Sequence, residues 1–365
     1  MSENYLTIIF DGSIYSLQEY GGISKYLTNL LNSLVKLKSK IKVDLLLPKP
    51  ASKYFLNRKI SFIPHPIYTN LLIKRFKNII NNTFLYNKNL IQIFHAPYYE
   101  KPPFNDMMSV ITVHDLIYEK FPQYFPRTKD TIKFLDNIKM SIKKATSIIC
   151  VSQTTKKDLE AYYDTRGKKV SVVYHGINHD IYHPENHQSI QGKDITYVGS
   201  RANYKNFPLL VKAFSKWKSK NKFRLHVVGQ RLSKKELNLL KKHDISNFII
   251  TTNPKETTLV NIYQKSHALV LPSHYEGFGL PLLEAAACAT LVLASDIPAH
   301  REIGEKFPMY FNPNKHEELI DALNASLSSK LRNKHIFAGI ICSKKFNWSK
   351  TAAQTLQIYE DLIKS

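Results

Sequence analysis

The sequence has few cysteines, no long hydrophobic run and no leader-like start. Its 3 cysteines among 365 residues, at positions 150, 288 and 342, are too widely spaced for a zinc site and too few for a disulfide framework. The longest apolar stretch, Ala285 to Ala294, is far shorter than the roughly 20 residues of a membrane-spanning helix. The first five residues lack the basic segment of a signal peptide. These absences predict a globular, cytoplasmic protein.

Acidic side chains are also scarce, since 29 Asp and Glu residues accompany 52 Lys and Arg residues and the net charge is +23. A nucleic acid, an anionic membrane or an acidic ligand would each suit this charge. However, 43 of the cations are lysines, which fits a compositional bias, and no nucleic-acid recognition motif is present. Positive charge is most concentrated in the basic segment Lys36 to Lys77, which has 11 basic residues and a single acidic one, Asp44. We therefore expect no specific nucleic acid partner and a peripheral contact of this segment with an anionic membrane.

Short β-branched runs alternate with amphipathic segments along the whole chain, a pattern typical of parallel α/β sheets. The expected strands are Leu6–Phe10, Val43–Leu47, Ile91–Phe94, Val110–Val113, Ser147–Val151, Val170–Val173, Ile195–Val198, Arg224–Val228, Phe248–Thr251, Ala268–Leu271, Thr290–Leu293 and Met309–Phe311. The expected helices are Gly22–Leu37, Ser152–Tyr162, Phe207–Lys218, Lys234–His243, Lys255–Ser266, Leu280–Ala287 and Trp348–Lys364.

A polar connector, His183 to Ser189, separates two series of these units. We expect a first domain over residues 1–183, a second over 184–345 and a closing helix within 346–365. Each domain is expected to be a doubly wound, Rossmann-like parallel sheet. The two domains should face each other across a cleft, because such sheets bind ligands at the carboxyl ends of their strands.

The densest cluster of functional residue types runs from His274 to Glu284, directly after an expected strand. Its glycines let backbone N–H groups approach a ligand, and Pro281 suits a first helical turn. A helix N-terminus favours an anion or a hydroxyl-rich ligand. Glu276 and Glu284 flank this loop, and carboxylates accept hydrogen bonds from vicinal hydroxyls. The segment therefore predicts a site for an anionic or hydroxyl-rich ligand.

Other candidates also follow expected strands or open expected helices. Arg201 and Lys205 come just after the first strand of the second series and are expected to converge on phosphates. In the first series, Gly22 opens a helix and His114 closes a strand, as ligand-binding residues of parallel sheets do. His95 and His175 also end strands, and we expect structural roles for them before supporting ones.

Several familiar motifs are absent from the sequence. There is no G-x-G-x-x-G with a downstream acid, no Walker A sequence, no H-E-x-x-H and no D-x-D. These absences argue against a dinucleotide cofactor and against a dedicated catalytic metal.

With these residues in place, the sequence resembles the retaining glycosyltransferases of family 4, the group 1 glycosyltransferases, which have the GT-B fold. Its most specific feature is the carboxylate pair within E-G-F-G-L-P-L-L-E. Where family members commonly have Gly-Thr-Pro after the helix of the second glutamate, this chain has Ala289-Thr290-Leu291. The other matching segments are Gly21–Ile23, Phe94–Pro97, His114–Ile117, Val151–Ser152, His175–Ile177, Gly199–Arg201, Lys205–Asn206 and Phe346–Trp348.

The resemblance implies transfer of a hexose from a nucleotide diphosphate sugar to an acceptor hydroxyl, with the anomeric configuration retained and no essential metal. Arg201 and Lys205 would neutralise the leaving diphosphate, and Gly22 would approach it from the first domain. His114 would lie near the reacting face of the sugar. The donor sugar would be bound by Glu276, Gly277, Phe278, Gly279 and Leu280, and the ribose by Glu284.

Within this family, the sequence most resembles mannosyltransferases that use GDP-mannose. The acceptor would be a glycan or a lipid-linked glycan. UDP-hexose and dTDP-rhamnose donors stay open, as do a GT-B-fold epimerase and a non-catalytic protein that binds nucleotide sugars or polyanions. Acceptor-binding loops are expected around residues 50–75 and 98–108. The closing helix would cross back onto the first domain.

Overall fold

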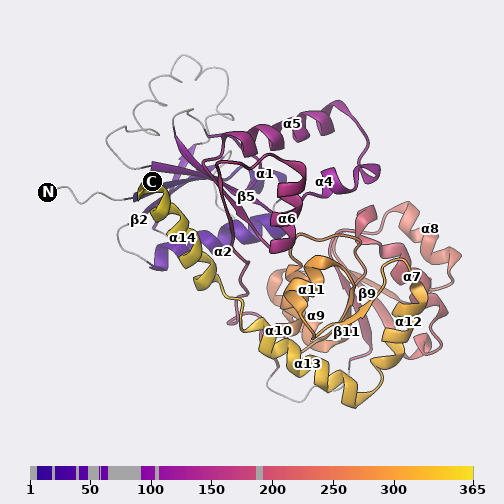
Figure 1. Cartoon of the computed structure of the whole chain (residues 1–365). Coiled ribbons are helices and arrows are strands. Elements are labelled where there is room, and N and C mark those ends of the chain that lie inside the picture. Colours follow the sequence, from indigo (N-terminus) through magenta and orange to yellow (C-terminus); the bar gives the residue numbers. More distant parts are fainter. Residues whose placement is uncertain are drawn as a thin grey trace. The chain divides into compact units, whose positions relative to one another are not determined.

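The computed structural model describes residues 6–18, 21–37, 41–47, 57, 59–64, 92–102, 107–185 and 192–364 (Figure 1). The chain divides into two compact units. Unit 1 comprises Met1–Lys120, Phe125–Gly176 and Trp348–Ser365, and unit 2 comprises Phe121–Tyr124 and Ile177–Asn347. The main crossover from unit 1 to unit 2 therefore follows Gly176, whereas the sequence analysis placed the boundary after residue 183. Much of the basic segment and of the expected acceptor loop 50–75 lies outside the described residues.

Unit 1 is built on a seven-stranded parallel sheet of order β3-β2-β1-β4-β5-β6-β7. Its strands are β1 (Leu6–Asp11), β2 (Ile41–Leu47), β3 (Ile60–Pro64), β4 (Gln92–Ala96), β5 (Met108–Val113), β6 (Ser147–Cys150) and β7 (Lys169–Val172). Its helices are α1 (Ile14–Leu17), α2 (Gly22–Leu37), α4 (Ile117–Lys120), α5 (Lys129–Lys144), α6 (Gln153–Tyr162) and α14 (Trp348–Lys364).

The sequence analysis missed β3 and α5. Strand β3 lies at the edge of the sheet, where Phe62 is exposed, so its side chains show little of the apolar run that marks the central strands. Helix α5 is amphipathic and buries Ile138, Ser141 and Ile142 on one face, so its apolar periodicity was present in the sequence and was overlooked.

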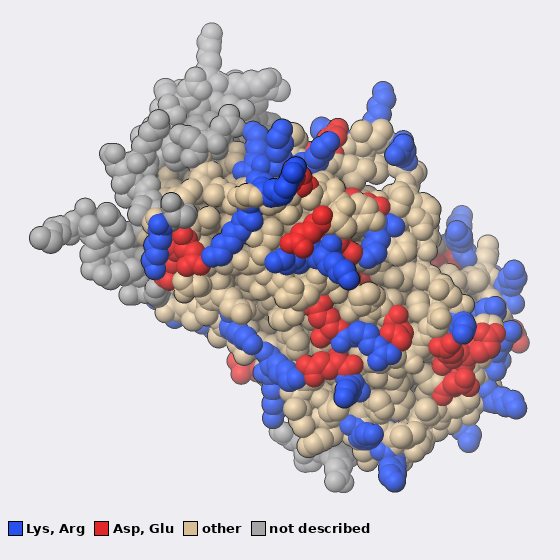
Figure 2. All heavy atoms as spheres, in the orientation of Figure 1, with Lys and Arg blue, Asp and Glu red and all other residues tan. Residues whose placement is uncertain are grey.

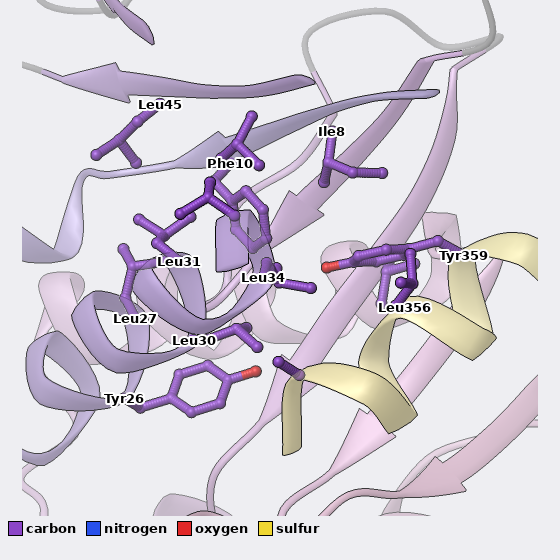
Figure 3. Packing of buried hydrophobic residues seen from close by; sticks show 14 of the residues in the cluster. Ile8, Phe10, Tyr26, Leu27, Leu30, Leu31, Leu34, Leu45, Leu356 and Tyr359 are labelled. Carbon is purple, nitrogen blue, oxygen red and sulfur yellow. The ribbon is translucent and has the colours of Figure 1, made fainter. Parts of the chain in front are cut away.

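The last helix of the chain, α14, belongs to the core of unit 1 and packs along α2 (Figure 3). Leu356 and Tyr359 of α14 lie beside Leu30 and Leu34 of α2 and beside Ile8 of the sheet. Burial of these apolar side chains stabilises the unit, by about 1.5–3 kcal/mol for each fully buried leucine. Unit 1 is therefore completed by residues that lie far from it in the sequence.

A buried hydrogen-bond network ties α2 and α14 to the sheet. The Tyr26 hydroxyl lies 3.0 Å from Oγ1 of Thr112, and Nε2 of His95 lies 2.8 Å from the same oxygen. Nδ1 of His95 contacts the hydroxyl of Tyr359. Buried polar groups need such partners, so His95, which lies inside β4, has a structural role, as expected.

Unit 2 is built on a six-stranded parallel sheet of order β10-β9-β8-β11-β12-β13. Its strands are β8 (Asp194–Val198), β9 (Arg224–Val228), β10 (Ile249–Thr252), β11 (Ser266–Leu271), β12 (Leu291–Ser295) and β13 (Met309–Phe311). Its helices are α7 (Phe207–Lys216), α8 (Lys234–Lys242), α9 (Glu256–Lys265), α10 (Leu280–Ala287), α11 (Pro298–Gly304), α12 (His316–Ala325) and α13 (Ser329–Ser343).

Two features of unit 2 bear on the sequence analysis. Ala289, at the position where a glycine is common in the family, adopts the left-handed conformation with φ of 58°. A side chain there costs about 1–2 kcal/mol relative to the right-handed form, so the turn keeps the glycine-type backbone at some cost.

Helices α11, α12 and α13 were not predicted. Phe337 and Ile341 of α13 are exposed while Arg332 is buried, so the apolar periodicity is weak.

Both sheets are doubly wound. The first strand of each lies between the second strand and a later one, β1 between β2 and β4, and β8 between β9 and β11. The carboxyl ends of such strand pairs form the switch point at which these sheets bind ligands. The expected α/β fold with two Rossmann-like parallel sheets is confirmed. In the described part of the chain, no helix combines the length and apolar character needed to cross a bilayer.

Candidate functional site

The loops that follow β8, β11 and β12 in unit 2 lie at one edge of the sheet, because these strands are parallel neighbours. Asn206, at the start of α7, has the left-handed conformation with φ of 55°. Its side-chain amide donates to the carbonyl oxygens of Pro272 at 3.1 Å and Pro313 at 2.7 Å. This asparagine connects the loop after β8 to the loops after β11 and β13 and fixes the backbone on which Lys205 stands.

Lys205 and Glu276 form the central ion pair of this edge. Nζ of Lys205 lies 2.7 Å from both carboxylate oxygens of Glu276, and Oγ of Ser273 donates to Oε1 over 2.7 Å. Burial raises the pKa of Glu276, but the charge of Lys205, the partial charge of His300 and these hydrogen bonds outweigh it, so the pKa is lowered overall. At neutral pH the site therefore holds an ionised carboxylate beside an ammonium group.

The glycine loop is the segment Gly277, Phe278 and Gly279, which leads into α10. Gly279 has φ of 97° and precedes the first turn, in which Pro281 needs no N–H partner. A Cβ on Gly279 would stand 3.5 Å from the His300 ring, so the loop lies flat against this histidine. The positive φ and the proline together let the backbone N–H groups of the loop and of the helix start turn toward a ligand.

His300, which the sequence analysis did not select, is a fully buried neighbour of the loop. Its Nδ1 lies 3.0 Å from the carbonyl oxygen of Ser295, so Nδ1 carries the hydrogen. Burial lowers the pKa of His300, and the imidazole is neutral at pH 7. Nε2 is buried and lacks a hydrogen-bond partner among the described residues. The ring supports Gly279 and faces the ion pair without adding a full charge to it.

Glu284 lies one turn inside α10 and is almost completely buried, with 4% of its surface exposed. The hydroxyl of Tyr263 donates to Oε2 of Glu284 over 2.9 Å. The two carboxylates of the sequence motif therefore have different surroundings, because Glu276 is paired with a cation and Glu284 receives a tyrosine hydroxyl.

The described hydrogen bonds of Arg201 are all made with the loop after β9 and with α8. Its side chain turns to the loop after β9, where Nη2 donates to the carbonyl oxygens of Gln230 at 2.8 Å and Arg231 at 2.9 Å. Nε donates to Glu236 over 2.5 Å, and Nη1 is buried without a hydrogen-bond partner among the described residues. No contact that the structure describes joins Arg201 to the Lys205–Glu276 pair. The expected convergence of Arg201 and Lys205 on phosphates stays a prediction that rests on Nη1 alone.

The two expected residues of unit 1 have contrasting surroundings. Gly22 is the first residue of α2, and a Cβ there would meet no atom within 4 Å, so the helix start is open. His114 is buried, and its Nε2 donates to the carbonyl oxygen of Pro97 over 2.8 Å. Burial lowers the pKa of His114 to about 4, against the effect of that hydrogen bond. Its side-chain N–H is thus already committed, and a further hydrogen bond to a ligand would be accepted by Nδ1.

The sequence analysis selected Lys205, Glu276 and Glu284 as candidates but did not select Ser273, Tyr263 and His300, which contact them or the glycine loop. Ser273 directly follows β11 and could have been found from that position. Tyr263 and His300 sit on helices whose sequences show no motif, and their roles arise from contacts with residues up to 21 positions away. In the described part of the chain, no group of three histidine, cysteine or acidic side chains comes together as a metal site would require. Metal independence stays a prediction.

Comparisons with known proteins match both halves of the chain to glycosyltransferase family models. A family model described as glycosyltransferase family 4 matches residues 20–181, and one described as glycosyl transferases group 1 matches residues 179–339. The chain is 31% identical over 213 residues to the O-antigen chain mannosyltransferase RfbU of Salmonella typhimurium. That match spans 56% of this chain and 56% of the Salmonella protein, so it covers little more than half of that relative.

Two further similarities extend over more of the chain. The O-antigen chain mannosyltransferase B of Escherichia coli is 23% identical, over 73% of this chain and 74% of its own. The structure of a sucrose-phosphate synthase from Thermosynechococcus elongatus superposes with a TM-score of 0.76 at 18% identity and covers 99% of both chains. At that identity the structural likeness concerns the fold alone.

Proposed function

The chain belongs to the group 1 glycosyltransferases of family 4, and we propose that it moves mannose from GDP-mannose to a hydroxyl of a glycan or lipid-linked glycan. We further propose that the anomeric configuration is retained and that no metal is essential. The observation that carries this proposal is the Lys205–Glu276 ion pair beside the glycine loop. The pair brings an ammonium group and an ionised carboxylate together beyond the carboxyl ends of the strands, a combination that suits a diphosphate and sugar hydroxyls.

The proposed reaction breaks the bond between the anomeric carbon and the oxygen of the diphosphate, and the electron pair stays on that oxygen. The acceptor oxygen then bonds to the anomeric carbon from the same face, and its proton passes to the departing phosphate oxygen. The developing phosphate charge needs a fixed cation, which Lys205 would supply. The ionised Glu276 would stabilise the positive charge on the sugar ring and hold a hydroxyl. No enzyme nucleophile is required in this scheme.

The other donor contacts are assigned as the family resemblance implies them. The backbone of Gly277, Phe278, Gly279 and Leu280 would bind the sugar, and Glu284 the ribose. For Gly22 and His114 of unit 1, the open helix start and the neutral imidazole are compatible with contacts to phosphate and to a sugar hydroxyl. Arg201 would contribute through Nη1 if it contacts the diphosphate.

Mannose is favoured by the names of two relatives, both O-antigen chain mannosyltransferases, at 31% and 23% identity. The test is thermal unfolding of the protein with GDP, UDP, dTDP and their sugars, because a ligand that binds the folded state raises the melting temperature. We expect GDP and GDP-mannose to give the largest shifts. A larger shift with UDP or dTDP compounds would replace mannose by another hexose or by rhamnose. Absence of any shift would contradict a nucleotide-sugar enzyme.

Part of the net charge of +23 is proposed to bind the protein to the anionic cytoplasmic face of a membrane. Figure 2 shows Lys and Arg side chains spread over the face drawn, with Asp and Glu among them, so the described surface there offers no single basic patch. The basic segment between Lys36 and Lys77 is the proposed contact, and of its cations the structure describes only Lys36, Lys42 and Lys59. Binding to anionic vesicles, compared with neutral ones, tests this part, and equal binding would contradict it.

A further inference from the structure

A buried tyrosine holds the second carboxylate of the site. Tyr263, on α9, is fully buried and donates its hydroxyl hydrogen to Oε2 of Glu284 over 2.9 Å. The main chain of Tyr263 is also held, because Oγ1 of Thr290 donates to its carbonyl oxygen over 2.6 Å. The backbone that carries this hydroxyl is therefore held in place, because the end of α9 is hydrogen-bonded to Thr290, the residue before β12.

The electrostatics of this contact keep the hydroxyl a donor. Burial, and then the negative charge of Glu284, raise the pKa of Tyr263 well above its usual value. A carboxylate that is 4% exposed needs donors of this kind. The hydrogen bond is charge-assisted and therefore stronger than one between neutral groups.

We propose that Tyr263 is a positioning residue for nucleotide recognition, in which it fixes the Glu284 carboxylate in the orientation that accepts the ribose hydroxyls of the donor. This inference rests on the proposed function, in which Glu284 binds the ribose. A carboxylate offers about four lone-pair sites, and the Tyr263 hydroxyl takes one of them. Fixing the carboxylate before binding reduces the ordering cost of association.

The chain contains a matched control for this pair. Tyr182 is also buried, and its hydroxyl donates to Oε1 of a different glutamate, Glu256, over 2.8 Å. Its ring centroid lies 6.4 Å from that of Tyr263. Replacing either tyrosine with phenylalanine removes one buried hydroxyl that donates to a carboxylate. Among the hydrogen bonds that the structure describes, the one to Glu284 comes from Tyr263, whereas Tyr182 donates to Glu256.

The experiment measures the affinities of GDP, 2′-deoxy-GDP and 3′-deoxy-GDP for four proteins, with the corresponding uridine nucleotides in parallel. The proteins are the wild type, Tyr263→Phe, Tyr182→Phe and Glu284→Gln. We expect the wild type to prefer the ribonucleotide over either deoxy form by about 10-fold or more, the size of one hydrogen bond to a charged group. Tyr263→Phe should lose about 10-fold in affinity for the ribonucleotide and little for the deoxy forms. Tyr182→Phe should keep the wild-type preference.

The outcomes separate the inference from the proposed function. If Glu284→Gln loses the preference for ribose while Tyr263→Phe keeps it, the positioning role is wrong and the assignment of Glu284 stands. If Glu284→Gln keeps the wild-type preference, both are wrong. An equal loss of affinity for all three nucleotides in Tyr263→Phe also contradicts the inference, because general structural damage has that effect.

A second measurement does not depend on the folding of any variant. A crystal structure of the wild-type protein with GDP should show the Tyr263–Glu284 hydrogen bond intact and the Glu284 carboxylate within hydrogen-bond distance of the ribose. A carboxylate rotated away from Tyr263 when the ribose is bound would overturn the proposal.

Discussion

Replacing Lys205 with alanine should lower kcat/KM for sugar transfer by about 10²–10³-fold, the usual cost of removing one group that stabilises developing charge in a transition state. The departing diphosphate would then leave without the Lys205 ammonium group, which lies 2.7 Å from the Glu276 carboxylate oxygens. Affinity for the free nucleoside diphosphate should fall as well, because its phosphates lose the same contact. Steady-state kinetics and calorimetric titration with GDP measure the two effects.

The control for Lys205→Ala is Lys212→Ala, an exposed lysine on α7. This change also removes one positive charge, so it tests whether overall charge matters. It should leave kcat/KM within about 2-fold of the wild type, since exposed substitutions away from a site have small effects. Turnover in Lys205→Ala that equals that of Lys212→Ala would remove Lys205 from the mechanism.

The second change is Glu276→Gln, which keeps the shape of the side chain and removes its charge. We expect a loss of about 10²–10⁴-fold in kcat, because the carboxylate would stabilise positive charge on the sugar that is greatest in the transition state. Affinity for GDP should change little, since Glu276 is assigned to the sugar rather than to the phosphates. The two variants are thus distinguished by GDP binding, which falls in Lys205→Ala and is kept in Glu276→Gln.

The ionisation of Glu276 adds a pH dependence to this prediction. The folded-state pKa of this carboxyl is lowered below 4.5, so its ionised form stabilises the fold at higher pH, and this contribution is lost as the pH falls from about 4.5 through the folded-state value. Because Glu276 is already fully ionised near pH 7, its titration should cause no change in activity around neutral pH. Glu305→Gln, at an exposed ion pair with Lys345, is the control. Equal activity of the Glu276 and Glu305 variants would contradict the assignment.

Parts of the fold followed from the sequence because their signals are local. The expected bounds of Gly22–Leu37 and Trp348–Lys364 match α2 and α14, since both helices bury one continuous apolar stripe. The glycine loop and α10 followed from Gly279 and Pro281, whose backbone preferences act within one turn. The roles proposed for the two carboxylates come from the family resemblance.

Other parts could not be predicted, because long-range contacts decide them. Arg201 forms its hydrogen bonds with residues 29 to 35 positions further along the chain, and nothing in its own segment reveals that these partners compete for the guanidinium. The contact between His95 and Tyr359 joins residues 264 positions apart. Tyr263 gave no signal either, since a tyrosine near the end of an amphipathic helix usually belongs to the core.

We propose that this chain is a retaining glycosyltransferase that uses a nucleotide diphosphate sugar. NMR of the first product formed from GDP-α-mannose and a glycan acceptor tests this proposal most directly. The one-bond coupling between the anomeric carbon and its proton reports whether the new bond is α or β. The account predicts an α-linked product formed with one GDP released per sugar transferred. A β-linked product would contradict retention, and conversion of the donor without an acceptor would indicate an epimerase instead.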